Sequence, residues 1–93
     1  MDSEKVYEIV EIARNTGKIK KGANEVTKVA EKGQAKLIIG ATDTSPKEII
    51  MHLSIIAKEK KIPNVEVDSK EQLGASAGLP ISTAAIAVTK EGD

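Results

Sequence analysis

Nine consecutive residues, from Lys20 to Lys28, carry the side chains with the clearest capacity for chemistry. They read Lys-Lys-Gly-Ala-Asn-Glu-Val-Thr-Lys. On a helix, Asn24, Glu25 and Lys28 would share one face, because residues three and four apart are neighbours. Lysine neutralises phosphate or donates to guanine, asparagine pairs with an adenine edge, and glutamate accepts from base amino or imino groups. These residue types are therefore suited to contact with a nucleic acid.

The start of this expected helix adds a second feature. Gly22 has no Cβ, so another backbone can approach closely, and the free amides and dipole of a helix start favour phosphate. The RNA backbone would repel the carboxylate of Glu25. Its place among lysines is therefore consistent with RNA binding if Glu25 accepts a hydrogen bond from a base. The alternative is an ordinary amphipathic helix whose exposed side happens to be Asn-Glu-Lys, and the pattern leaves both open. Further lysines that could supply a positive field surround the segment: Lys18, Lys20, Lys21, Lys32 and Lys36.

Length and composition limit the alternatives. A chain of 93 residues predicts a single domain, residues 1–93. Lys+Arg and Asp+Glu both number 14, so the net charge is zero and a binding face must come from local segregation of charge. Tyr7 is the only aromatic residue, which removes base stacking on aromatic rings and predicts a core of Ile, Val, Leu and Ala.

Several classes of protein are not indicated by the sequence. The chain has no cysteine, which excludes disulfides and thiolate-bound zinc. No apolar run approaches the roughly 20 residues of a membrane helix, and the polar N-terminus lacks a signal-peptide pattern. We expect a cytoplasmic protein with no membrane partner. His52 is interpreted as structural, Asp43 as a turn residue and Tyr7 as a packing residue, and we expect no enzyme, metal site or cofactor.

The remaining sequence predicts the elements that position these residues. Spacing of apolar residues predicts helices and strands in strict alternation, beginning with a helix. The expected core-facing stripes are Val26, Val29 and Ala30 in the second helix and Ile49, Leu53, Ile56 and Ala57 in the third. Such alternation predicts an α/β protein, a three-layer α/β/α sandwich with a central mixed sheet. Capping boxes begin at Ser45 and Ser69. The predicted helices cover residues 3–15, 22–32, 45–60 and 69–78, and the predicted strands 18–20, 36–41, 65–67 and 83–89.

Segment 20–28 resembles the signature of the archaeal kink-turn-binding ribosomal protein family (large-subunit protein L-seven-Ae, with its eukaryotic small-nucleolar and spliceosomal relatives). The resemblance extends in order along nearly the whole chain, with almost no gaps. It includes the turn and strand from Gly33, the helix from Ser45 to its exit at Pro63, and the segment from Ser69 through Gly78 to the closing strand.

The resemblance implies recognition of a kink-turn, a sharply bent RNA internal loop with sheared G·A pairs and one extruded nucleotide. It implies a structural role in the ribosome or in small ribonucleoprotein particles, with ribosomal or guide RNA and ribonucleoprotein proteins as partners. Asn24, Glu25 and Lys28 fall where the family contacts the sheared pairs, and Gly22, flanked by Lys21, falls where its backbone meets phosphate. The residues that fall around the extruded base are Ile49, Lys70 and the loop Leu79-Pro80-Ile81.

The sequence also departs from the family pattern. Ser45 stands where the family is often acidic, Pro80 where it is usually polar, and Asn64 where it is usually aromatic. Family members usually continue beyond the position of Asp93 into a final helix, which suggests a truncated or simplified version. Together with the neutral charge, these departures motivate a second hypothesis, a scaffold or protein-interaction module of the same fold with weak or lost RNA binding. A third class, a small ligand-binding or enzymatic domain, would need a polar pocket that the sequence does not indicate.

Overall fold

The computed structural model describes residues 3–44 and 47–90, and the predicted alternation of helices and strands is confirmed there. Each element lies within a few residues of its predicted bounds. In chain order they are α1 (Ser3–Thr16), β1 (Lys18–Lys21), α2 (Ala23–Glu31), β2 (Leu37–Ala41), α3 (Glu48–Glu59), β3 (Asn64–Val67), α4 (Lys70–Ser76) and β4 (Ala85–Lys90).

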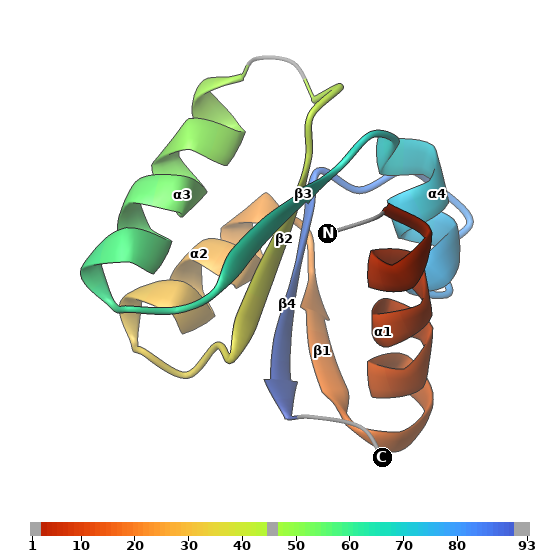
Figure 1. Cartoon of the computed structure of the whole chain (residues 1–93), viewed down its shortest axis with the longest axis horizontal. Helices are drawn as coiled ribbons and strands as arrows, with labels where there is room; N and C mark the ends of the chain where they lie inside the picture. Colours follow the sequence, from red (N-terminus) through yellow and green to blue (C-terminus); the bar gives the residue numbers. More distant parts are fainter. Residues whose placement is uncertain (1–2, 45–46, 91–93) are drawn as a thin grey trace.

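The four strands form one mixed sheet in the order β1-β4-β2-β3. Strand β4 runs antiparallel to both of its neighbours, whereas β2 and β3 are parallel. Helices α2 and α3 cover one face of the sheet, and α1 and α4 cover the other (Figure 1). The predicted three-layer α/β/α sandwich with a mixed central sheet is therefore confirmed.

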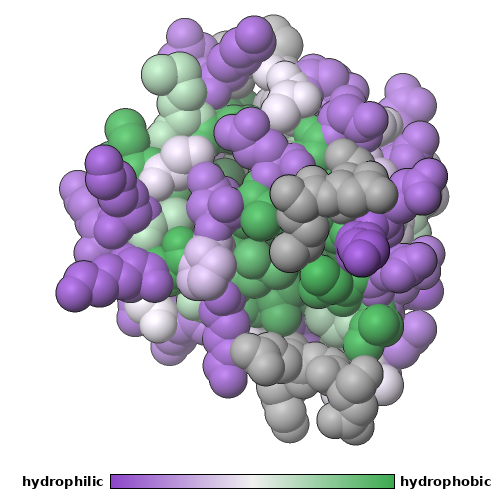
Figure 2. Space-filling model, in the orientation of Figure 1, coloured by the Kyte–Doolittle hydropathy of each residue, from purple (hydrophilic) through white to green (hydrophobic). Residues whose placement is uncertain are grey.

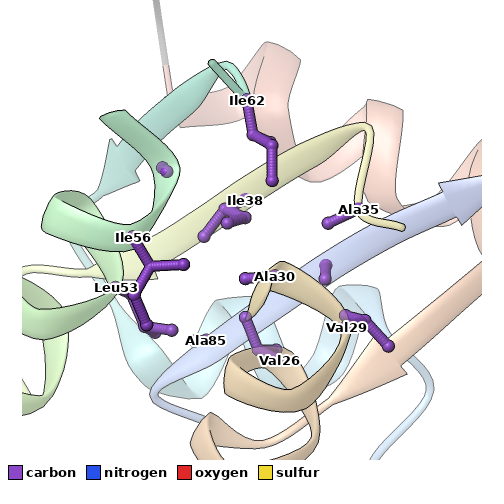
Figure 3. Packing of buried hydrophobic residues seen from close by; sticks show 11 residues of the cluster. Val26, Val29, Ala30, Ala35, Ile38, Leu53, Ile56, Ile62 and Ala85 are labelled. Carbon is purple, nitrogen blue, oxygen red and sulfur yellow. The ribbon is translucent and has the colours of Figure 1, made fainter. Parts of the chain in front are cut away.

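Alternate residues of the central strands point into two separate cores, as the pleat of a strand requires. Ile38, Ala85 and Ala87 pack with α2 and α3, and Figure 3 shows the buried side chains of these helices gathered around Ile38. Ile39 and Ile86 pack with α1 and α4 on the opposite face. Burying one such isoleucine or leucine contributes about 1.5–3 kcal/mol, so a core without Phe or Trp suffices for a domain of this size.

The apolar stripe of α3 differs from the sequence prediction by one residue. Ile49 was expected to point into the core, but Ile50 is buried there and Ile49 is only half-buried. The reason lies across the interface in β2, where a Cβ on Gly40 would sit 3.0 Å from Cγ2 of Ile50. The absence of a side chain at Gly40 thus makes room for Ile50. The capping residues proposed for this helix, Ser45 and Pro46, lie outside the described residues.

Of the second predicted capping box, at the start of α4, the serine N-cap is confirmed. The Ser69 hydroxyl accepts a hydrogen bond from the Gln72 amide at 3.2 Å. Figure 2 shows hydrophilic side chains over much of the rim of the molecule and hydrophobic surface across the middle of this face, where the sheet lies. Within residues 3–44 and 47–90, no helix is both long and apolar enough to cross a membrane.

Candidate nucleic-acid interface

The turns before α2 and α4 lie at the same end of the sheet. Strands β1, β2 and β3 end there and β4 begins there, at the top of Figure 1. The backbone of β4 joins them, because the Gly22 amide donates to the Ala85 carbonyl (3.0 Å) and the Ala41 amide donates to the Ala84 carbonyl (2.9 Å). We call this end of the sheet the loop edge, comprising Gly22 and residues 42–44, 68–69 and 79–84.

Helix α2 begins at the loop edge without a side-chain cap. Its N-cap, Gly22, has φ 90° and ψ 146°, a conformation that residues with a Cβ rarely adopt, and the space its side chain would occupy is open. The Gly22 amide is already bonded to Ala85, and the first helical bond runs from the Val26 amide to the Gly22 carbonyl at 3.0 Å. The amides of Ala23, Asn24 and Glu25 find no acceptor in the described part of the chain. These three amides are the donors that an anion at this start would meet.

The polar side of α2 is fully exposed. Asn24, Glu25 and Lys28 are all exposed, whereas the opposite side of the helix is buried against the sheet. Oε1 of Glu25 lies 3.9 Å from Nζ of Lys28, and the two side chains remain 54% and 68% exposed. An exposed ion pair of this kind contributes little stability. Both charged groups can therefore leave this contact and bind a ligand with little loss of free energy.

Two of the lysines expected around this site lie elsewhere. Lys20 and Lys21 are exposed near the end of β1, next to the start of α2. Lys18 is paired with Lys90 at the far end of the sheet, and the Lys36 amide donates to the Val88 carbonyl at that same end. Lys32 is the C-cap of α2, about 14 Å along the helix from its start. The expectation that these lysines surround the polar face of α2 is therefore wrong for Lys18 and Lys36, whereas Lys32 lies one turn beyond Lys28.

Lys70 enters the loop edge as the first residue of α4, with a half-buried side chain. Its amide donates to Oδ1 of Asp43 at 2.9 Å, and its carbonyl accepts from the Thr83 amide at 3.1 Å. The main chain of Lys70 is thus held from two sides, by the turn after β2 and by the segment before β4. Thr83 makes this contact instead of joining β4, which is why the strand begins two residues later than predicted.

The loop Leu79-Pro80-Ile81 lies along α4. The Leu79 amide donates to the Gly74 carbonyl at 2.9 Å, and the Ile81 carbonyl occupies the space that a Cβ on Gly74 would need. Leu79 is half-buried, whereas Pro80 and Ile81 are exposed, Ile81 by 70%. A depression of about 470 Å³ is lined by this loop together with Glu71 and Ala75 of α4. Ile49 belongs to α3, on the other face of the sheet, so these predicted contacts come from both sides of the loop edge.

Residues 4–93 match the model of the ribosomal protein L7Ae/L30e/S12e/Gadd45 family. The chain belongs to this family. Among solved structures it is similar to the Giardia lamblia 15.5kD RNA binding protein, with a TM-score of 0.90 and 32% sequence identity over 96% of this chain and 74% of that chain. The resemblance inferred from the sequence and the α/β fold are both confirmed by these matches.

In this member of the L7Ae/L30e/S12e/Gadd45 family, the sequence did not reveal the hydrogen bonds that join the loop-edge segments. Asp43 was interpreted as a turn residue and Tyr7 as a packing residue, and each also makes a hydrogen bond. The Tyr7 hydroxyl donates to Oδ1 of Asp68 (2.9 Å) and to the Ser69 carbonyl (3.4 Å). The partners are 27 residues from Asp43 and 61 from Tyr7, so no local motif predicts these contacts.

The same contact changes the acidity of Tyr7. Burial, then the hydrogen bond to Asp68 and the negative charge of that carboxylate, raise the pKa of Tyr7 above 10.0. His52 is exposed on α3. No group of three or more histidine, aspartate or glutamate residues that could hold a metal ion occurs within the described ranges.

Proposed function

We propose that this family member binds kink-turn RNA and stabilises its bent form, as a structural component of the ribosome or of a small ribonucleoprotein particle. Family membership and the RNA-binding structural neighbour support the RNA partner. The observation that carries the finer proposal is the start of α2, where open amides and the exposed side chains of Asn24, Glu25 and Lys28 lie together. The proposed function contains no catalytic step.

Each part of the α2 start has a separate task in this proposal. The amides of residues 23–25 and the ammonium group of Lys21 bind phosphate, where the helix dipole also favours negative charge. Glu25 accepts hydrogen bonds from donors on the sheared G·A pairs, and Asn24 pairs with a base edge. Because Gly22 has no side chain and open space beside it, the RNA backbone can approach the start of the helix closely.

One loop of the loop edge and two residues on the helices beside it would hold the extruded nucleotide. The proposed contacts are Ile49, Lys70 and the loop 79–81, which supply apolar surface and one positive charge without an aromatic ring. A protein that binds the bent RNA better than the extended RNA shifts the population toward the bent form. The proposed role is therefore to stabilise one RNA conformation.

A binding titration against two RNAs tests the proposal. The first RNA carries a kink-turn, and the second has the same length and composition but disrupted G·A pairs. We expect the first to bind at least tenfold more tightly, corresponding to about 1.4 kcal/mol. Equal affinity for both RNAs across a range of salt concentrations would contradict recognition of the kink-turn.

A second candidate function, a protein-interaction module with weak or lost RNA binding, is favoured by a different surface. Met51 and Ile55 of α3 are 61% and 57% exposed. They line a groove of about 260 Å³ between α3 and β3, together with Ile50, Ser54 and Glu66. Such a module would form a complex or an oligomer detectable by light scattering and would bind neither RNA even at low salt. A specific complex with the kink-turn RNA would exclude it.

A further inference from the structure

We infer that Asp43 is a positioning residue, which fixes the point from which Lys70 reaches the extruded nucleotide. This inference rests on the proposed function, because it concerns how one proposed RNA contact is prepared. The contact that carries it is the hydrogen bond from the Lys70 amide to Oδ1 of Asp43 at 2.9 Å. It joins the turn after β2 to the start of α4, two segments 27 residues apart in the chain.

The chemistry of this contact suits a fixed geometry. A carboxylate that accepts from a backbone amide forms a charge-assisted hydrogen bond, which is shorter and stronger than a neutral one. The amide belongs to the first residue of α4, where the helix dipole favours a negative charge. Water could hydrate both groups, because the contact is exposed. The bond is therefore not needed to satisfy a buried polar group. Its main effect is to fix the position of the turn after β2 relative to the start of α4.

The Lys70 carbonyl is held as well. It accepts from the Thr83 amide at 3.1 Å, and the Thr83 hydroxyl donates to the Ala85 carbonyl, also at 3.1 Å, in a buried position. Strand β4 thus supports one side of Lys70, and Asp43 supports the other. With both its amide and its carbonyl bonded, Lys70 has a fixed main chain, so its long side chain starts from a defined place and direction. Less conformational freedom then remains to be lost when it binds a ligand.

Two observations separate this role from the alternatives. Helix α4 already has its cap, because Ser69 accepts from the Gln72 amide, so Asp43 is not needed to begin the helix. A direct contact with RNA is also disfavoured, because an exposed carboxylate is repelled by phosphate. If Asp43 acted only through its charge, its removal would tighten RNA binding. The positioning role predicts the opposite sign.

A double-mutant cycle on the full chain tests the inference. Affinity for the kink-turn RNA is measured for the wild type, Asp43→Ala, Lys70→Ala and the double variant, with folding checked by circular dichroism. We expect Asp43→Ala to weaken binding roughly twofold to tenfold, which corresponds to the net free energy of one hydrogen bond. In the Lys70→Ala background we expect Asp43→Ala to have no further effect. Asp43→Asn keeps an oxygen acceptor, so it should lose less affinity than Asp43→Ala.

A charge-matched control is Glu66→Ala, which removes an exposed carboxylate from β3 without touching Lys70. We expect its affinity to equal or exceed that of the wild type. Equal losses from Asp43→Ala in both backgrounds, or tighter binding by Asp43→Ala, would overturn the positioning role while leaving the proposed function intact. If the wild type does not distinguish the kink-turn from its disrupted control, the proposed function fails first, and the inference fails with it. If Asp43→Ala does not fold, Asp43→Asn takes its place in the same cycle, and a coupling of the same sign but smaller size is expected because its amide oxygen still accepts from the Lys70 amide.

Discussion

Helices α2 and α4 begin at the same edge of the sheet but in opposite states. The start of α2 is a glycine with no side-chain cap, followed by amides without acceptors in the described residues. The start of α4 has a serine cap, a carboxylate on its first amide and a backbone donor on its first carbonyl. One start is open to a ligand, and the other is closed by the protein's own groups.

The difference indicates that the two helix starts have different roles in binding. A glycine N-cap such as Gly22 makes the helix less stable than a side-chain cap would by only about a few tenths of a kcal/mol, and it leaves the first amides of α2 free for phosphate. The amide and carbonyl of Lys70 are both hydrogen-bonded within the protein, so they are not available to a ligand. These bonds instead fix the main chain from which the charged side chain of Lys70 extends. We infer that α2 recognises the RNA and that α4 presents one side chain at a fixed place.

The largest expected effect comes from removing the base-reading side chains of α2. Glu25→Ala and Asn24→Ala should each weaken kink-turn binding by ~1–3 kcal/mol, the range for loss of a good base contact. Binding titrations measure the loss, and circular dichroism confirms the fold. Glu31→Ala is the matched control, because Glu31 is exposed at the other end of the same helix. Equal losses for Glu25→Ala and Glu31→Ala would show that the loss does not come from a base contact specific to Glu25.

The next largest effect is expected from replacing Gly22, which tests whether RNA binding at the start of α2 requires a residue without a side chain. Gly22→Ala and Gly33→Ala each place a side chain on a residue with positive φ and open surroundings. Both should lower the free energy of unfolding by roughly 1–2 kcal/mol through backbone strain alone, as measured by urea denaturation. Only Gly22→Ala should also weaken RNA binding, because Gly33 lies beyond the other end of α2. A binding loss of the same size for Gly33→Ala would remove the special role of the α2 start.

Lys28→Ala should change the salt dependence of binding if the Lys28 ammonium group contacts a phosphate beside the sheared pairs. Replacing a lysine that contacts phosphate lowers the slope of log affinity against log salt by about one unit. Lys58→Ala serves as the control, because Lys58 is exposed in the last turn of α3. An unchanged slope for Lys28→Ala would indicate that Lys28 contacts a base or the solvent instead of phosphate.

The smallest effect concerns the closed start of α4. Tyr7 is the only aromatic residue, so ultraviolet absorbance follows its ionisation alone. The midpoint should lie above 10.0, and Asp68→Asn should lower it by removing a negative charge. Because the folded-state pKa is raised, the stabilisation is complete below pH 10.0 and is lost as the pH rises through the folded-state pKa. Tyr7→Phe should lack this part of the alkaline loss of stability, and a wild-type midpoint at or below 10.0 would contradict the raised pKa of Tyr7.

Local patterns in the sequence predict much of this fold. The apolar stripe of α2 at Val26, Val29 and Ala30 and the serine N-cap at Ser69 are confirmed because each depends on residues within one or two turns of helix. The buried residue of α3 was misplaced by one position because Gly40, in another element, decides it. The hydrogen bond between Asp43 and Lys70 joins residues far apart in the chain, so it depends on how the strands are arranged and no local pattern predicts it. The same holds for the separation of Lys18 and Lys36 from the start of α2.

Amide hydrogen exchange, measured by NMR with and without RNA, tests the central claim most directly. In the free protein, the amides of residues 23–25 should exchange rapidly, whereas those of Lys70 and Gln72 should be slowed by their bonds to Asp43 and Ser69. Saturating kink-turn RNA should slow exchange at residues 23–25, and the RNA with disrupted G·A pairs should not. Unchanged exchange at residues 23–25 in the presence of bound kink-turn RNA would contradict the assignment of the α2 start as the recognition site.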